Sequence, residues 1–293
     1  MRTEVRSGEL SGLLVTARPR QWSKNALVLV APLSAGVLLE SDVIVSVVAA
    51  FVAFVMASAS IYLVNDTLDR EADRLHPVKR HRPVAAGRVR PNVALATAVV
   101  LALGSVALSA LVDPDLLATV GVYLVLQLAY ALWLKHVAVL DIAIVSSGFL
   151  LRAIAGGVAA DVPLSQWFLL VAAFGSLFMV AGKRYSELMT VGAAGGTRRS
   201  LNDYSDSYLR FVWSLAAAVA VTAYSLWAFE LVPTGHVNWQ AISIAPFVVG
   251  ILRYAVDVDR GLAGEPEDAV ARDRVLQVVG VVWVVVFALG VYG

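Results

Sequence analysis

The sequence contains no cysteine and few charged residues. Because none of its 293 residues is Cys, disulfide bonds and thiol chemistry are excluded. Charged residues make up 15% of the chain, whereas a soluble domain typically carries about 25%. Hydrophobic residues make up 59%, and the mean hydropathy is +0.76. The composition therefore predicts a multi-pass integral membrane protein rather than a soluble domain.

Long apolar runs recur along the chain, and a membrane-spanning helix needs about 20 such residues. We expect nine spans, at residues 23–39, 42–64, 91–111, 115–134, 137–160, 164–183, 208–231, 238–256 and 274–292. With this arrangement, every lysine and arginine except Arg152 falls on one side of the membrane. Because basic connections stay in the cytoplasm, that side is predicted to be cytoplasmic, in the inner (plasma) membrane.

The predicted fold class is all-α, with a single transmembrane domain over residues 1–293. The longest cytoplasmic loops are expected at about 65–90, 183–207 and 253–273. A glycine-rich stretch at 192–197 indicates a loop. Tyr204, Asp206 and Tyr208 follow it and are candidates for a cytoplasmic lid. Because the polar residues are concentrated on one face of the membrane, we expect the chemistry there.

The densest group of polar residues follows the second apolar run. The motif N-D-x-x-D-x-x-x-D places Asp66, Asp69 and Asp73 at offsets of three and seven residues. At 100° per residue these aspartates lie within roughly a 60° arc of one helix face and extend about 10 Å along its axis. Such carboxylates suit Mg²⁺ ions that hold a diphosphate, and Asn65 can add an amide oxygen. The alternative is a solvated loop, since basic residues are interleaved with the acids.

A basic segment follows the acids in the sequence. Lys79, Arg80 and Arg82 lie beside the motif. Basic side chains fit phosphate oxygens, and arginine can bind two of them at once. These residues are therefore candidates for binding the substrate. Anchoring of the loop on the cytoplasmic side of the membrane is the alternative role.

Two charged residues lie within the fifth apolar run. Asp141 is in its first turns, and Arg152 is well inside it. A charge at membrane depth is costly without a partner and predicts a functional role. Asp141 can instead form a structural pair. Arg152 can instead extend toward the interface, since long basic side chains reach water from within a membrane.

These motifs resemble the UbiA superfamily of intramembrane prenyltransferases, and the resemblance covers essentially the whole chain. The acidic motif at the cytoplasmic end of the second span carries it. Within the superfamily, the chain is similar to the decaprenyl-phosphate phosphoribosyltransferase branch. The similar segments are ARPRQWSKNALVLVAPL (17–33), NDTLDREADRLHPVKRHRPVAAG (65–87), LKHVAVLDI (134–142), GFLLRAIAGG (148–157) and AGKRYSEL (181–188). The resemblance implies a UbiA-like helix bundle with a cytoplasm-facing polar cavity.

The resemblance implies an Mg²⁺-dependent transferase. In that branch the donor is phosphoribosyl pyrophosphate (PRPP) and the acceptor is decaprenyl or another polyprenyl phosphate. The product is decaprenylphosphoryl-5-phosphoribose, a precursor of the arabinan of cell-wall arabinogalactan. The implied catalytic residues are Asp66, Asp69 and Asp73, which also bind the metal together with Asn65. The lipid bilayer is the other partner. No nucleic acid is expected, and a homo-oligomer is compatible with the sequence.

The resemblance also implies substrate contacts outside the acidic motif. Gln21, Lys24 and Asn25 precede or begin the first span and correspond to substrate contacts in the family. Tyr130 and Lys135 end the fourth span, where the family has a Tyr/Lys pair. The spacing between them is one residue longer here than in the usual pattern.

One departure from the family pattern concerns the end of the sixth span. Prenyltransferases of this superfamily carry a second D-x-x-x-D there, whereas this chain has K-R-Y-S-E. Lys183 and Glu187 are four residues apart and fall on one helix face. Lys183 or Arg184 can bind the 5-phosphate of PRPP. The alternative is that Lys183 and Glu187 form a surface ion pair without a role in binding.

Two other functions remain open at this point. A UbiA-type prenyltransferase would move a prenyl group from its diphosphate to an aromatic acceptor, and it would be expected to carry the second acidic motif. A polyprenyl-phosphate transporter would be expected to contain inverted repeats and broken helices around a site at the bilayer midplane. Neither inverted repeats nor broken helices are clear in the sequence. The missing acidic motif therefore favours phosphoribosyl transfer.

Overall fold

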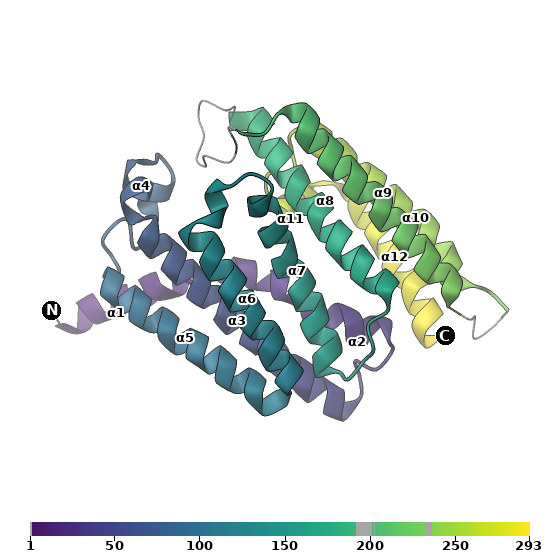
Figure 1. Cartoon of the computed structure of the whole chain (residues 1–293), viewed down its shortest axis with the longest axis horizontal. Helices are drawn as coiled ribbons and strands as arrows, with labels where there is room; N and C mark the ends of the chain where they lie inside the picture. The colour runs from purple at the N-terminus through teal and green to yellow at the C-terminus, as the bar shows by residue number, and fades with distance from the viewer. Residues whose placement is uncertain (1, 192–200, 202, 232–235) are drawn as a thin grey trace. The chain divides into compact units, whose positions relative to one another are not determined.

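The computed structural model describes residues 2–191, 201, 203–231 and 236–293, and every regular element within these ranges is helical. Arg198, Arg199 and the glycine-rich stretch of the predicted loop 183–207 lie outside the described residues. The helices form two compact units (Figure 1). Unit 1 comprises Met1–Leu33, Val37–Leu134 and Leu151–Pro163, and unit 2 comprises Ser34–Gly36, Lys135–Leu150 and Leu164–Gly293. The all-α fold class is confirmed for the described residues.

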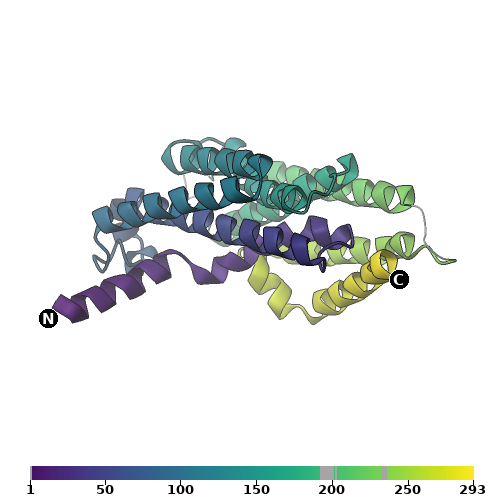
Figure 2. The ribbon, with the colours of Figure 1, turned by 90° about the horizontal axis from the view of Figure 1, so that it is seen from below.

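Unit 1 is built around α3. Its elements are α1 (Arg2–Thr16), the 3₁₀ helix η1 (Pro19–Leu29), most of α2 (Val30–Ser34), α3 (Ser41–Leu68), α4 (Arg70–Leu75), the 3₁₀ helix η2 (Lys79–His81), α5 (Pro91–Val112), α6 (Pro114–Leu132) and the C-terminal part of α7 (Leu140–Ala159). Helices α3, α5 and α6 pack against one another, and α1 and η1 also contact α3 (Figure 2). Prolines begin α5 and α6, where the missing N–H of proline costs nothing.

Unit 2 consists of the N-terminal part of α7 and the helices that follow it. These are α8 (Gln166–Val191), α9 (Asp206–Glu230), α10 (Trp239–Asp259), α11 (Pro266–Arg272) and α12 (Arg274–Tyr292), with η3 (Leu134–His136) just before α7. Helix α8 packs along α9, and α10 contacts α8, α9 and α12. The side chains of Ser205 and Asp273 accept hydrogen bonds from backbone N–H groups in the first turns of α9 and α12. These N-caps fix where the two helices begin.

Eight helices in the described part of the chain are long and apolar enough to cross a membrane: α3, α5, α6, α7, α8, α9, α10 and α12. They coincide with eight of the nine predicted spans. The remaining predicted span, residues 23–39, is not one long α-helix, because the chain there passes through η1 and then α2, which ends at Ser34. The ninth span stays a prediction.

Packing within unit 1 explains why this first apolar run departs from a regular α-helix. A Cβ added to Gly156 of α7 would lie 1.8 Å from the carbonyl oxygen of Val28 in η1. The backbone of η1 therefore lies directly against α7. Asn25 of η1 is fully buried and accepts a 2.7 Å hydrogen bond from Arg152 Nε. Such tertiary contacts override local helix preference, and hydropathy alone does not register them.

Helix α1 was not expected from the sequence. It is too short for a membrane span, and the search for long apolar runs passes over it. It is fixed to the rest of unit 1 at two points. A Cβ on Gly12 would lie 2.6 Å from Val89 Cγ2, and Glu9 Oε1 accepts a 3.0 Å hydrogen bond from Arg90 Nε. Leu10 and Leu14 point away from these contacts, since they are 67% and 56% exposed.

Candidate functional site

The predicted aspartates of unit 1 lie where two helices meet. Asp66 is in the last turn of α3, which ends at Leu68, and Asp73 is in α4. Asp69 stands between the helices with φ −84° and ψ 2°, a conformation that interrupts regular α-helix. The predicted helix is therefore interrupted at Asp69. Asp66 and Asp73 are nevertheless both buried, with 2% and 3% exposed.

Two arginines compensate this buried acidic pair. Arg82 Nη1 donates to Asp73 Oδ2 at 2.7 Å and to Asp66 Oδ1 at 3.2 Å. Arg18 Nη2 donates to the same Asp66 oxygen at 2.6 Å. The arginine side chains are 30% (Arg18) and 26% (Arg82) exposed, so the cations lie closer to solvent than the acids do. The buried acids are therefore paired with two arginines that a ligand could reach from solvent.

The chemistry of this pair fits a divalent metal ion. Carboxylate oxygens of Asp66 and Asp73 lie within hydrogen-bond distance of one nitrogen atom, so both can approach one cation. Mg²⁺ takes a few carboxylates and completes its shell with water and substrate phosphates. Within the described ranges, no group of three His, Cys, Asp or Glu residues could hold a metal ion by itself.

Arg82 of the predicted basic segment contacts both Asp66 and Asp73. Lys79 and Arg80 lie in η2, and the exposed Arg80 directs its Nε to His81 Nε2 at 3.3 Å. Arg18 was not among the predicted substrate contacts. Its backbone is left-handed, with φ 54°, where η1 begins, and its guanidinium also lies 4.7 Å from the centre of the Tyr62 ring. A basic residue before a proline gives no sequence signal for this placement.

Arg152 is held inside unit 1 and does not extend toward the interface. It is 6% exposed, and its Nη2 donates to Tyr123 Oη at 3.1 Å. Its guanidinium lies 4.9 Å from the centre of the Tyr123 ring and 5.6 Å from that of Phe54. Together with the bond to Asn25, these contacts tie η1 to α6 and α7. The observed role is structural, and contact with substrate stays a prediction.

The other predicted residues of η1, α6 and η3 are partly exposed. Gln21 and Lys24 lie in η1, beside the buried Asn25. Tyr130 lies near the C-terminal end of α6 and Lys135 in η3. Their exposure leaves them accessible to a ligand, and their roles stay predictions.

A second charged cluster lies in unit 2, around Asp141. This residue, at the start of α7, is fully buried. Its Oδ2 accepts a 3.2 Å hydrogen bond from Arg184 Nε of α8, and its Oδ1 accepts a 2.5 Å bond from Tyr204 Oη. Arg184 is 2% exposed and also donates to Glu187 at 3.0 Å. Asp141 is thus engaged in structural pairing, the alternative that the sequence left open.

Lys183 is the more accessible cation of the K-R-Y-S-E segment. Its side chain is 23% exposed, and its Nζ lies 2.9 Å from Glu265 Oε1 and 4.0 Å from Glu187 Oε1. The predicted pairing of Lys183 with Glu187 is therefore present, although Glu265 is the shorter contact. Because Arg184 is buried, Lys183 is the better placed of the two for binding a phosphate.

Tyr204 joins the buried Asp141 to a strained position in the chain. Its hydroxyl oxygen accepts the backbone N–H of Val139 at 2.5 Å. Val139 has φ 71°, a left-handed conformation that costs a β-branched residue about 1–3 kcal/mol. Burial raises the pKa of the Tyr204 hydroxyl above its ordinary value, and its hydrogen bond to Asp141 raises it further. The hydroxyl therefore stays protonated and donates a hydrogen bond to Asp141.

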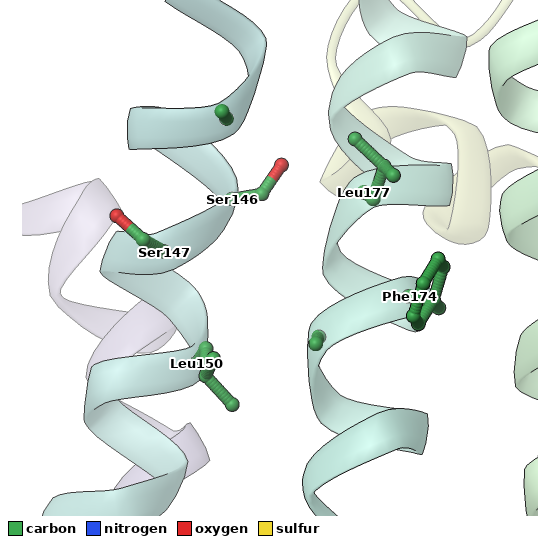
Figure 3. Close-up of a pocket in the computed structure, with 7 residues that line it drawn as sticks. Ser146, Ser147, Leu150, Phe174 and Leu177 are labelled. Carbon is green, nitrogen blue, oxygen red and sulfur yellow. The ribbon is translucent and has the colours of Figure 1, made fainter. Parts of the chain in front are cut away.

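A hollow of about 230 Å³ lies between α7 and α8 in unit 2 (Figure 3). It is lined by Ala143, Ser146, Ser147, Leu150, Ala173, Phe174 and Leu177. The hydroxyls of Ser146 and Ser147 donate to carbonyl oxygens of their own helix. The hollow therefore presents a mainly apolar surface, which does not suit a charged sugar phosphate.

Comparison with known proteins gives consistent results. The UbiA prenyltransferase family model matches residues 29–259. The decaprenyl-phosphate phosphoribosyltransferase of Mycolicibacterium smegmatis is 52% identical over 296 residues, which cover 97% of this chain and 93% of that protein. The protein of the same name from Corynebacterium glutamicum is 49% identical, over 96% of this chain and 87% of its own.

The fold is also found among solved structures. The structure of a UbiA homolog from Archaeoglobus fulgidus bound to GPP and Mg²⁺ aligns with a TM-score of 0.74. The alignment covers 95% of this chain and 98% of that one, at 15% sequence identity. At this identity the likeness shows the fold. Taken together with the family match and the close relatives, it shows that the chain belongs to the UbiA prenyltransferase family.

Proposed function

We propose that this protein transfers the 5-phosphoribosyl group from PRPP to decaprenyl phosphate. Diphosphate is released and decaprenylphosphoryl-5-phosphoribose, a precursor for cell-wall arabinan, is formed. The observation that carries the proposal is the identity of 49–52% to decaprenyl-phosphate phosphoribosyltransferases over 96–97% of the chain. The buried Asp66–Asp73 pair and its arginines support it, because this arrangement suits a metal-bound diphosphate.

The diphosphate of PRPP is proposed to bind at the acids of unit 1 through Mg²⁺. Asp66 and Asp73 hold the ion, and Asp69 and Asn65 are the neighbouring oxygen donors of the same motif. When bound, Mg²⁺ neutralises the charge that grows on the departing diphosphate. A UbiA homolog solved with GPP and Mg²⁺ supports a divalent ion in this fold.

Arg18 and Arg82 are proposed to act on the same diphosphate. In the structure they compensate Asp66 and Asp73. With Asp66 and Asp73 holding a metal ion, both guanidinium groups would be available to phosphate oxygens, which arginine binds in a bidentate manner. The partial exposure of both side chains permits this movement. The arginines then stabilise the leaving group electrostatically.

The transfer itself is a displacement at the anomeric carbon of PRPP. The bond from this carbon to a diphosphate oxygen breaks, and a bond to a phosphate oxygen of the lipid forms. The lipid phosphate is already anionic at neutral pH, so no general base is needed. A single displacement with inversion is the simplest outcome. Lys183 is proposed to bind the 5-phosphate, because it is the accessible cation of its segment.

The proposed topology has nine spans, a polar cavity that faces the cytoplasm, and a location in the inner membrane. The support is the distribution of charge, because every lysine and arginine except Arg152 falls on one side in that arrangement. A site at this face gives a soluble sugar donor access while the polyprenyl chain of the acceptor stays in the bilayer.

Incubation of the purified protein with radiolabelled PRPP and decaprenyl phosphate tests the proposal. A lipid-linked phosphoribose is expected, its formation should stop with EDTA, and added Mg²⁺ should restore it. A parallel incubation supplies a prenyl diphosphate and an aromatic acceptor. Product in that incubation, with none from PRPP, would replace phosphoribosyl transfer by the prenyltransferase alternative.

A further inference from the structure

Tyr204 connects the segment before α9 to the first turn of α7. Its hydroxyl is the acceptor for Val139 N–H and the donor to Asp141 Oδ1, with both distances 2.5 Å. The side chain is buried, with 6% exposed. Tyr204 therefore makes two hydrogen bonds across 63 and 65 residues of sequence, and one of them has a carboxylate as acceptor. Hydrogen bonds to charged groups are among the stronger ones in proteins.

The position of Tyr204 is itself fixed by the start of α9. Its ring stacks on that of Tyr208, with centroids 5.7 Å apart and planes at 10°. The backbone N–H of Tyr208 donates to Ser205 Oγ at 3.1 Å, which caps α9. Because the start of α9 fixes the Tyr204 ring, the two hydrogen bonds of its hydroxyl constrain the start of α7.

The left-handed conformation of Val139 requires a partner that maintains it. A β-branched residue avoids positive φ unless its surroundings impose it. The hydrogen bond from Val139 N–H to Tyr204 provides such a constraint, two residues before Asp141. Tyr204 therefore acts on both the backbone and the side chain at the start of α7.

We propose that Tyr204 is a latch that positions the charged end of α8 through Asp141. Tyr204 orients the Asp141 carboxylate, Asp141 holds Arg184, and Arg184 holds Glu187 beside Lys183. Tyr204 is a positioning residue, because it acts on PRPP binding through these groups. This consequence for PRPP rests on the proposed function, whereas the hydrogen bonds of the latch do not.

Tyr204→Phe separates the latch from simple packing, because it keeps the ring and removes only the hydroxyl. Hydrogen exchange on purified protein without substrate is the first measurement. The amides of residues 139–143 are expected to exchange about tenfold faster than in the wild type, since a hydrogen bond to a charged group is lost. Tyr208→Phe is the matched control and should leave these amides unchanged. Unchanged exchange in Tyr204→Phe would overturn the latch.

A double-mutant cycle with Val139→Gly tests the strain. Glycine adopts positive φ without strain, so Val139→Gly should raise the unfolding temperature of the otherwise wild-type protein. In Tyr204→Phe the backbone can already relax, so the same change should raise it less. Equal shifts in both backgrounds would contradict the latch. Asp141→Asn, which weakens the acceptor and leaves Tyr204 intact, should reproduce the faster exchange.

Steady-state kinetics then test the connection to PRPP. Tyr204→Phe is expected to raise KM for PRPP about tenfold and to change kcat much less, because it loosens groups that bind the donor. An unchanged KM together with faster exchange would overturn the link to PRPP and leave the latch in place. If the wild-type protein makes no lipid-linked phosphoribose at all, the proposed function fails, while the exchange experiment still tests the latch.

Discussion

The charged cluster around Asp66 and Asp73 and the charged cluster around Asp141 differ in which partner is buried. In unit 1 the acids are buried, whereas Arg18 and Arg82 are 30% and 26% exposed. In unit 2, Asp141 and Arg184 are both inaccessible, at 0% and 2% exposed. A cation that reaches solvent can leave its acid when a metal ion or a phosphate arrives. A fully buried pair cannot separate without a large desolvation cost. This difference in burial supports the two proposed roles, exchange of partners in the first cluster and positioning in the second.

The largest expected effect is on the stability of unit 2. Asp141→Leu should destabilise the protein by about 3–5 kcal/mol, because it removes the fully buried carboxylate that pairs with the buried Arg184. Thermal unfolding in detergent, followed by tryptophan fluorescence, measures the change. The double replacement Asp141→Leu with Arg184→Met is the matched control and should recover much of the loss, because it removes both charges. A single variant as stable as the wild type would contradict the structural role.

The next largest effect concerns turnover and should leave unit 1 folded. Asp66→Asn and Asp73→Asn should each lower kcat for phosphoribosyl transfer by about a hundredfold or more, because each removes a proposed carboxylate ligand. Their unfolding temperatures should change much less than that of Asp141→Leu. Glu71→Gln removes an acid from α4 that is exposed and pairs with Arg74, so it should keep activity. If kcat fell equally in all three variants, the loss would reflect the removal of any negative charge in this region and not the loss of a metal ligand.

A smaller effect is expected on metal binding without substrate. Arg82 Nη1 donates to both Asp66 and Asp73, the carboxylates that would hold a metal ion. Arg82→Gln should therefore bind Mn²⁺ alone about tenfold more tightly, equivalent to about 1.4 kcal/mol. Electron paramagnetic resonance of free Mn²⁺ measures this affinity. Arg80→Gln removes the same charge from the neighbouring exposed residue and should leave the affinity close to that of the wild type. Weaker binding of Mn²⁺ by Arg82→Gln would contradict the proposal that Arg82 and a metal ion compete for Asp66 and Asp73.

The smallest effect is expected at the pair that joins α1 to α5. The side-chain hydrogen bond from Arg90 holds the pKa of the Glu9 carboxyl below its ordinary value of 4.5. Its contribution to stability is therefore present above pH 4.5 and lost as the pH falls through the lowered pKa. Glu9→Gln should lower the unfolding temperature slightly at pH 7, and this difference should disappear in strong acid. A difference that persists there would indicate packing instead of charge.

The membrane spans were the most predictable part of the fold. Continuous apolar runs decide them, and the run at 42–64 corresponds to α3 at Ser41–Leu68. The first run forms η1 and then α2 and not one long α-helix, and the sequence did not predict this form, because it depends on the approach of Val28 to Gly156, far away in the sequence. The break at Asp69 was missed for a similar reason, since the helical spacing of the aspartates continues through it.

The candidate site was predictable in its acids but less so in their partners. Asp66 and Asp73 followed from a local motif, and Arg82 from the basic segment beside it. Arg18 reaches Asp66 across 48 residues, and Tyr204 reaches Asp141 across 63. Such contacts depend on how helices pack, and no local spacing encodes them. Arg152 was selected because a charge at membrane depth needs partners, and the structure supplies them as Asn25 and Tyr123.

The attachment of Arg82 only nine residues from Asp73 has a consequence for inhibitors. A tethered guanidinium is present at a high effective concentration, in the millimolar range for short flexible connections. A positively charged compound aimed at the two carboxylates would have to outcompete this built-in occupant. A compound bearing an acidic group would instead have to outcompete Asp66 and Asp73 for Arg18 and Arg82, and it would approach the more exposed partners of these ion pairs.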